Sequence, residues 1–301
     1  MDCPPVEIVE VGPRDGLQNE PEILSTATKL ALINRCLAAG VKRIEVASFV
    51  HPRRVPQMAD AEDVCAGLPA IDGLTYIGLV MNMRGVERAL ATRVHEIGGV
   101  ACSSDAFGVA NQGRSAAETV EDAVAVIRAA KAAGRRGQAT ITVAFGCPFE
   151  GAVPVERVVE AARRIAAAEP HEIAIADTIG VATPGQVRTV MQAVRAAVPG
   201  MPLRLHFHDT RNMAVANAWA ALEDGAATLD ASVGGAGGCP FAPGATGNVA
   251  TEDLLYMLAP AGLAPPIALD AMVETGRWLG EALGKELPSK QAKAPAFPPA
   301  N

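Results

Sequence analysis

The sequence predicts an α/β protein of one domain, a (β/α)₈ TIM barrel with extra C-terminal helices. Eight short apolar segments alternate with helical stretches, which is the order of elements in parallel α/β folds. The 301 residues are 50% hydrophobic, enough to bury one large core in a barrel of ordinary size. No G-x-G-x-x-G follows the first strand, which weakens the competing open doubly wound sheet.

The predicted strands are rich in β-branched residues and short enough to be buried parallel strands. They cover Val6–Val11, Arg43–Ala47, Leu74–Val80, His95–Val100, Gln138–Phe145, Glu172–Ala176, Leu203–Phe207 and Thr228–Val233. The clearest helices have apolar residues three and four apart and cover Thr26–Ala39, Ala116–Ala133, Val155–Ala168, Pro184–Val198 and Ala214–Asp224.

Two further helices, Thr251–Ala261 and Leu269–Leu283, are predicted after the eighth strand. The segment that follows them, Pro288–Asn301, is rich in Pro, Ala and Lys. We therefore expect one catalytic domain over residues 1–287 and a flexible tail over residues 288–301.

Composition and charge exclude several classes of protein. The formal net charge is −7 and no polybasic run occurs, so neither a nucleic acid nor a membrane surface is an expected partner. The six cysteines contain no C-x-x-C pair, which favours reduced thiols in the cytoplasm. Met1–Pro5 lacks the features of a signal peptide, and no apolar run reaches the roughly 20 residues of a membrane helix. We expect a cytoplasmic protein.

Residues that carry chemistry gather where the predicted strands end. The active sites of (β/α)₈ barrels lie on this face, because the loops after the strands converge there. Five strands contribute polar groups: Arg14 and Asp15 after the first, Glu45 in the second, Asp177 after the sixth, His206 and His208 in the seventh, and Cys239 after the eighth. These are the groups that a metal-assisted reaction needs.

His206 and His208 are the strongest candidates for metal ligands. Residues two apart on a strand face the same side, so both imidazoles can bind one ion. The alternative is a hydrogen-bonded pair without a metal, but two of only five histidines fall at the end of one strand. Asp15 can add a carboxylate and Asn248 an amide oxygen. Two nitrogens and two oxygens suit Mg²⁺ or Mn²⁺ better than a structural zinc site, which favours thiolates.

The neighbouring polar residues have structural as well as chemical interpretations. Asp209 should point away from the histidine pair and cap the next helix. Asp177 can cap a turn or belong to the site, and both interpretations stay open. Arg14 can stabilise the negative charge of an enolate oxygen, and a salt bridge to Glu45 is compatible with that role.

Cys239 follows four glycines in the five residues 234–238. Such a loop can move over a site, and a thiol on it can transfer a proton once water is excluded. A cysteine beside glycines is usually an ordinary small residue. Its position just after the eighth strand is what makes Cys239 a catalytic candidate.

Several long motifs in order resemble those of 3-hydroxy-3-methylglutaryl-CoA lyases, over most of the chain. The opening motif Val9–Glu20, with Arg14 and Asp15 at its centre, is similar to the signature of that family. The further motifs that resemble the family are Val55–Met58, Gly146–Gly151, Asp177–Val181, Gly237–Ala242 and Gly244–Asp253.

The resemblance implies a retro-Claisen cleavage of an acyl-CoA into acetyl-CoA and a keto acid, acetoacetate for the parent substrate. It implies a divalent cation, Mg²⁺ or Mn²⁺. It places the cation on Asp15, His206, His208 and Asn248.

The resemblance also implies roles for the other site residues. Arg14 would polarise the thioester carbonyl, Glu45 would support Arg14, and Asp177 would line the site. Cys239 would assist proton transfer. Gln18 and Asn111 are the positions assigned to binding of the acyl-CoA. The acceptor of the hydroxyl proton stays open between a metal-bound histidine such as His206, Asp15 and a water molecule.

Two departures from the family pattern bear on the substrate. Arg211-Asn212-Met213 stands where familiar members have an aromatic residue and glycine, and residues 107–111 lack lysines that resemble CoA contacts. Citramalyl-CoA and a longer branched 3-hydroxyglutaryl-CoA are therefore alternative substrates. A condensing synthase of the same superfamily and a non-catalytic metal-binding protein are alternative functions. The chain's end soon after the barrel and its intact set of polar residues argue against these two. A homodimer is expected, because family members are often dimers.

Overall fold

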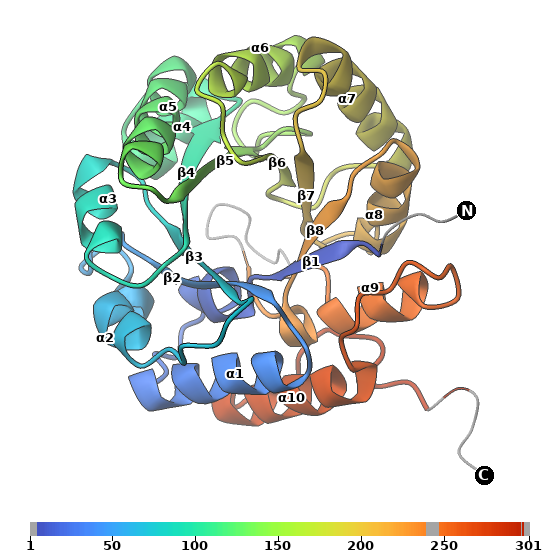
Figure 1. Cartoon of the computed structure of the whole chain (residues 1–301). Helices are drawn as coiled ribbons and strands as arrows, with labels where there is room; N and C mark the ends of the chain where they lie inside the picture. Colours follow the sequence, from blue (N-terminus) through green and yellow to red (C-terminus); the bar gives the residue numbers. More distant parts are fainter. Residues whose placement is uncertain (1–4, 239–246, 296, 298–301) are drawn as a thin grey trace.

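The computed structural model describes residues 5–238, 247–295 and 297, and the eight predicted strands form a closed parallel barrel (Figure 1). Strand order follows sequence order, and β8 pairs with β1 to close the sheet. The strands are β1 Glu7–Glu10, β2 Arg43–Ser48, β3 Thr75–Leu79, β4 Glu96–Cys102, β5 Arg136–Thr142, β6 Ile173–Asp177, β7 Leu203–Phe207 and β8 Thr228–Ala231. The predicted fold class is confirmed.

The helices surround the sheet as a ring (Figure 1). They are α1 Thr26–Ala38, α2 Ala61–Ala66, α3 Met83–Leu90, α4 Asp105–Gln112, α5 Ala116–Ala132, α6 Val155–Ala166, α7 Pro184–Ala197, α8 Ala214–Glu223, α9 Thr251–Leu258 and α10 Leu269–Leu283. Short helical turns occur at η1 Gly12–Gly16, η2 Pro56–Met58 and η3 Val233–Gly235. The sequence analysis did not predict α2, α3 and α4, which have six, eight and eight residues and therefore carry little periodicity. Within the described ranges, no helix has the length and apolar character to cross a membrane.

The two C-terminal helices have different places in the fold. The α9 helix follows β8 and stands beside α8, so it is the eighth helix of the ring (Figure 1). The α10 helix is additional to the barrel pattern, as is the short α4 that precedes α5, and α10 packs against α1, α9 and η3.

The first part of the predicted flexible tail is held against the barrel. The backbone N–H of Ser289 donates to the Gly234 carbonyl at 3.0 Å, and the Asp253 carboxylate accepts from the N–H groups of Lys290 and Gln291. The composition of the tail could not reveal this, because the acceptors lie far away in sequence. Residues 289–291 thus contact the barrel, while flexibility of residues 288–301 stays a prediction.

The aliphatic core lies between the sheet and the helices, while the lumen of the barrel is polar. Ile44, Ile97, Ile141 and Leu205 are fully buried among helix residues. Their strand neighbours alternate to the other face. Arg43, Glu96, Gln138, Arg204 and Asp230 are buried there, in the lumen. The aliphatic core thus forms the layer between sheet and helices, and charged side chains occupy much of the centre of the barrel.

Two buried carboxylates tie the end of β8 to neighbouring elements. Glu10 accepts hydrogen bonds from Gly12 N at 2.8 Å, Val233 N at 2.9 Å and Thr251 Oγ1 at 2.6 Å. Glu252 accepts from Gly234 N at 2.9 Å. Burial raises the pKa of Glu10 to about 7 and that of Glu252 to about 8.

The substitution Glu252→Gln should change how stability depends on pH. Because folding raises the Glu252 pKa from 4.5 to about 8, the folded state favours the protonated form. Its contribution to the free energy of unfolding is full below the unfolded pKa and is lost as the pH rises to about 8. Urea unfolding over this range should show a smaller decline for Glu252→Gln than for the wild type. The exposed Glu274→Gln on α10 is the control, and equal declines in all three proteins would contradict the prediction.

Candidate active site

A cavity of about 1160 Å³ opens at the carboxyl ends of the strands. Seven of the predicted site residues line it, and they come from the turn after β1, from β2, from α4 and from the end of β7. They are Arg14, Asp15, Gln18, Glu45, Asn111, His206 and His208. The structure therefore brings together most of the residues that the sequence singled out.

The turn after β1 places Arg14 and Asp15 over the barrel. The backbone N–H groups of Arg14, Asp15 and Gly16 all donate to the Val11 carbonyl, at 3.1, 2.7 and 3.2 Å, so the chain coils tightly. A Cβ atom on Gly12 would lie 2.6 Å from Glu10 Oε1, so a side chain at this position would displace the buried Glu10 carboxylate. The tight coil directs two successive charged side chains toward the cavity.

Two carboxylates hold Arg14, and one of them is Glu45, with which a salt bridge was expected. Its Nε donates to Glu45 Oε2 at 2.6 Å and its Nη1 to Asp15 Oδ1 at 2.5 Å. Burial raises the pKa of Glu45, and the Arg14 charge opposes that effect. Each terminal nitrogen of the guanidinium has a second N–H, which can bind an oxygen of a ligand.

The predicted metal ligands converge on one point. Asp15 Oδ2 lies 3.9 Å from His206 Nε2 and 3.7 Å from His208 Nε2. One ligand atom from each of these three residues lies within 4.8 Å of the other two. Asn248 Nδ2 is 2.9 Å from the same Asp15 oxygen, and an isolated backbone bridge pairs Asn248 with His208. The four residues therefore surround one small volume.

These residues fit a divalent cation. Asn248 Oδ1 is buried and has no hydrogen-bond partner among the described residues. Exchanging the two amide atoms, which have the same shape, would direct that oxygen to the ligand cluster, in place of the 3.1 Å hydrogen bond that Nδ2 donates to the Ala236 carbonyl. Burial alone would raise the pKa of Asp15, but Arg14 and the two imidazoles lower it well below its usual range. Asp15 is thus an ionised carboxylate, and a donor set of nitrogen and oxygen atoms would suit Mg²⁺ or Mn²⁺.

Asp230 orients one of the imidazoles and was missed by the sequence analysis. Its Oδ2 is 3.0 Å from His206 Nδ1, which leaves Nε2 to face Asp15. Burial raises the pKa of Asp230, but Arg204 and His206 lower it below the usual value. A charged residue in the middle of a predicted buried strand was the signal that could have revealed it.

Two aspartates cap backbone turns. Asp177 accepts from Val181 N and Ala182 N, both at 2.9 Å, and its side chain is buried. We therefore assign Asp177 to supporting the turn after β6, the structural one of its two interpretations, and not to contact with a substrate. Asp209 accepts from Ala214 N at 2.9 Å at the start of α8. The N-cap residue of this helix is Met213 and not Asp209 as predicted, so Asp209 bonds to the helix start from outside the N-cap position.

Cys239 lies outside the described residues. The residue before it, Gly238, lines the cavity, and its carbonyl accepts from Asn19 Nδ2 at 3.0 Å. The described chain after β8 therefore leads to the cavity.

Two arginines at the cavity were also missed. Arg54 follows β2 and Arg84 lies in the first turn of α3, and both are exposed. Neither has an ion pair among the described residues, whereas Arg88, which also lines the cavity, pairs with Glu62. Their shared location depends on how two separate loops fold, so no local pattern could reveal it.

Comparisons with known proteins identify the family. A family model described as HMGL-like matches residues 5–279. The hydroxymethylglutaryl-CoA lyase of Bacillus subtilis is 41% identical over 285 residues, which is 95% of each chain. The chain belongs to the hydroxymethylglutaryl-CoA (HMG-CoA) lyase family.

Other members of the HMG-CoA lyase family are equally similar. The "3-hydroxy-3-isohexenylglutaryl-CoA/hydroxy-methylglutaryl-CoA lyase" of Pseudomonas aeruginosa is 43% identical over 289 residues, 96% of each chain. The structure of an HMG-CoA lyase from Acinetobacter baumannii, in complex with coenzyme A and 3-methylmalate, has a TM-score of 0.93 at 36% identity. The match covers 98% of this chain and 97% of that one. As a member of this family the protein is a carbon–carbon lyase, which confirms the expected enzyme class.

The substitution Asp15→Asn should abolish most of the affinity for Mn²⁺. It removes the anionic ligand. Loss of a residue that only orients a ligand weakens metal binding by up to about 100-fold, so loss of the ligand itself should raise the dissociation constant for Mn²⁺ by at least that factor. Isothermal titration calorimetry on the protein without substrate measures this. Asp63→Asn, an exposed change on α2, is the control and should bind as the wild type does. Unchanged Mn²⁺ binding by Asp15→Asn would mean that the ion, if bound, lies elsewhere.

Proposed function

We propose that this family member cleaves 3-hydroxy-3-methylglutaryl-CoA to acetyl-CoA and acetoacetate with the help of Mg²⁺ or Mn²⁺. The observation that carries the proposal is the convergence of Asp15 with the Nε2 atoms of His206 and His208 beside the guanidinium of Arg14. Relatives named as HMG-CoA lyases, similar over nearly the full length, support the choice of substrate.

The reaction breaks the bond between C2 and C3 of the substrate. The tertiary hydroxyl on C3 loses its proton and C3 becomes a ketone carbon. The electron pair of the broken bond moves to C2 and the thioester carbonyl, which forms an enolate, and C2 then takes a proton to give acetyl-CoA. A cation held by Asp15, His206, His208 and Asn248 would supply a Lewis acid that lowers the pKa of the hydroxyl.

Arg14 is placed to stabilise the enolate oxygen. Glu45 and Asp15 fix its guanidinium before the substrate binds, so no reorganisation is needed when negative charge develops. The free N–H groups of its terminal nitrogens can donate to the thioester oxygen. Glu45 is in this scheme a positioning residue for Arg14.

The proton transfers involve a water molecule and Cys239. Asp15 is a weak base, because burial raises its pKa less than Arg14 and the imidazoles lower it. With His206 Nε2 on the cation and Nδ1 hydrogen-bonded to Asp230, that imidazole has no free lone pair, so the hydroxyl proton goes to a water molecule. Cys239, on the glycine-rich segment after β8, would assist the proton transfer that completes acetyl-CoA.

Arg54 and Arg84 would bind the phosphate groups of CoA. Both guanidinium groups line the cavity without a carboxylate partner in the described part of the chain. In this proposal the two arginines bind CoA in place of the lysines that familiar family members have in the segment equivalent to residues 107–111. Gln18 and Asn111 line the same cavity and would contact the acyl-CoA between the phosphates and the reacting carbons.

A longer 3-substituted substrate is the second candidate. The cavity wall includes the short side chains Thr140, Thr142 and Ala176, and a relative named for 3-hydroxy-3-isohexenylglutaryl-CoA is 43% identical. A panel of 3-hydroxyacyl-CoA thioesters scored for acetyl-CoA release separates the two candidates. A cytoplasmic location and a homodimer remain predictions.

The substitution Arg14→Met should lower kcat for HMG-CoA by about 10²- to 10³-fold, because it removes the donor to the enolate oxygen. Acetyl-CoA release in the presence of Mn²⁺ is the measurement. Arg14→Lys should recover only part of the rate, since an ammonium group cannot hold Glu45 and Asp15 together. For the wild type, a chelator should abolish release and added Mn²⁺ should restore it. Release that survives the chelator, or a normal rate for Arg14→Met, would contradict the proposed reaction.

The substitution Cys239→Ser should lower turnover by more than about tenfold with little loss of stability, because a hydroxyl transfers protons poorly where a thiol is required. Cys65→Ser on α2 is the matched control. Burial raises the pKa of the Cys65 thiol to about 11, and it lies outside the cavity. Equal turnover of wild type and Cys239→Ser would remove the thiol from the mechanism.

The double substitution Arg54→Ala/Arg84→Ala should raise KM by about tenfold, since two charge-assisted contacts to phosphate are lost. The kcat should change little, because both residues lie away from the reacting carbons. The effect should shrink for a thioester of dephospho-CoA or at high salt. Arg163→Ala, exposed on α6, is the control. A KM that does not change in the double variant would place the CoA phosphates elsewhere.

A further inference from the structure

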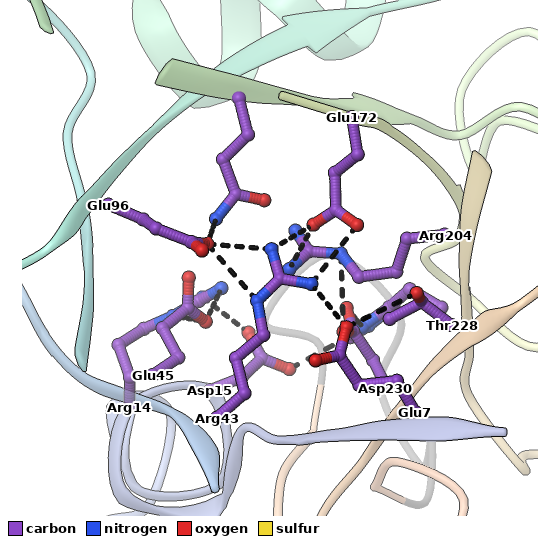
Figure 2. A network of polar contacts seen from close by, with 12 residues as sticks. Glu7, Arg14, Asp15, Arg43, Glu45, Glu96, Glu172, Arg204, Thr228 and Asp230 are labelled. Atoms are coloured by element: carbon purple, nitrogen blue, oxygen red, sulfur yellow. Dashed lines mark hydrogen bonds and ion pairs between the residues drawn. The ribbon is translucent and has the colours of Figure 1, made fainter. Parts of the chain in front are cut away.

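The lumen of the barrel contains charged side chains that the proposed reaction does not use. Five of them are buried and connected, and we call them the lumen array: Arg43, Glu96, Glu172, Arg204 and Asp230. Figure 2 shows the two guanidinium groups at the centre with the three carboxylates around them. Such an array is unusual, since barrel interiors are dominated by branched aliphatic residues.

The array begins at the amino ends of the strands. Arg43 and Glu96 are the first residues of β2 and β4. Arg43 Nη2 lies 2.6 Å from Glu96 Oε2 and 2.5 Å from Glu172 Oε1. The half-exposed Glu7 and Arg136 pair with Arg43 and Glu96 at 2.9 and 2.8 Å, and so end the array toward solvent.

The other end of the array reaches the candidate cation site. Arg204 Nη1 lies 3.2 Å from Glu172 Oε1, and Arg204 Nε lies 3.4 Å from Asp230 Oδ1. The second oxygen of Asp230 is 3.0 Å from His206 Nδ1. Arg204, His206 and His208 follow one another at intervals of two residues, so their side chains lie in a row on the lumen face. An unbroken series of charge contacts thus runs from the barrel floor to His206.

The charges of the array are unequal. Two buried guanidinium groups face three buried carboxylates, and the half-exposed Arg136 compensates Glu96 at the floor. Asp230 is the carboxylate with the weakest pairing. Its Oδ1 and Arg204 Nε have no hydrogen-bond partner among the described residues, so the two groups interact by charge alone.

We propose that Arg204 is a positioning residue of the cation site, which holds the Asp230 carboxylate against His206 Nδ1 so that His206 Nε2 stays directed at Asp15. Glu172 and Arg43 hold Arg204 in turn. The proposal rests on the cation site of the proposed function. Buried ion pairs contribute little net stability, so a role in ordering the site accounts for the array better than stability does.

The test is the affinity for Mn²⁺, measured by isothermal titration calorimetry on the full chain without substrate. Arg204→Met and Asp230→Asn should each weaken binding by about 10- to 100-fold, the usual effect of losing a group that orients a ligand. If Arg204 acts through Asp230, the double variant should bind within about twofold of Asp230→Asn. Lys29→Met is the matched control, because it breaks a buried pair with Asp60 at 2.5 Å outside the lumen. It should lower the melting temperature and leave Mn²⁺ affinity unchanged.

Wild-type affinity in Arg204→Met, or independent effects of the two substitutions, would overturn the proposal. Should Arg204→Met not fold, Arg204→Lys decides, since one ammonium nitrogen replaces the two nitrogens, Nη1 and Nε, that face Glu172 and Asp230. It should bind Mn²⁺ more weakly than the wild type, and equal binding would overturn the proposal. A wild-type protein that binds no Mn²⁺ would overturn both the proposal and the cation site. Failure to cleave HMG-CoA despite tight Mn²⁺ binding would count against the proposed substrate alone.

Discussion

The carboxylate of Asp15 joins the two halves of the site. One oxygen accepts a hydrogen bond from Arg14 at 2.5 Å, and the other lies 3.7 and 3.9 Å from the two imidazoles. Unit charges about 4 Å apart interact by roughly 4 kcal/mol at the effective dielectric of a partly buried site. A shift of this side chain therefore disturbs the guanidinium that faces the enolate and the ligands of the cation together. Fixing Asp15 is the requirement that the surrounding structure meets.

The backbone around Asp15 meets that requirement through Glu10. This buried carboxylate accepts hydrogen bonds from the turn that holds Asp15 and from Val233 at the end of β8. The two segments belong to opposite ends of the sequence and become neighbours only because β8 pairs with β1. Closure of the barrel thus brings the chain that leads to the glycine-rich segment beside the turn that provides Arg14 and Asp15.

The barrel separates two kinds of interior. Between the sheet and the helices, aliphatic side chains supply the apolar burial that stabilises the fold. Inside the sheet, charged side chains face one another, and burying them is costly unless each finds a partner. The polar lumen is continuous with the site, since Asp230 contacts both Arg204 and His206. Stability and chemistry are thus supplied by opposite faces of the same strands.

The sequence by itself determined the strands and the shared face of His206 and His208, because these follow from local periodicity and from strand ends. It offered the pairing of Arg14 with Glu45 only as one interpretation, and the structure decided it. It left the role of Asp177 open, and it missed Asp230 and the arginines at the cavity. Only the tertiary structure decided these, since their partners come from other strands and loops. Arg43 and Glu172, for example, are 129 residues apart and meet across the lumen. Alternation along a strand predicts which side chains enter the lumen, but closure of the sheet decides which of them touch.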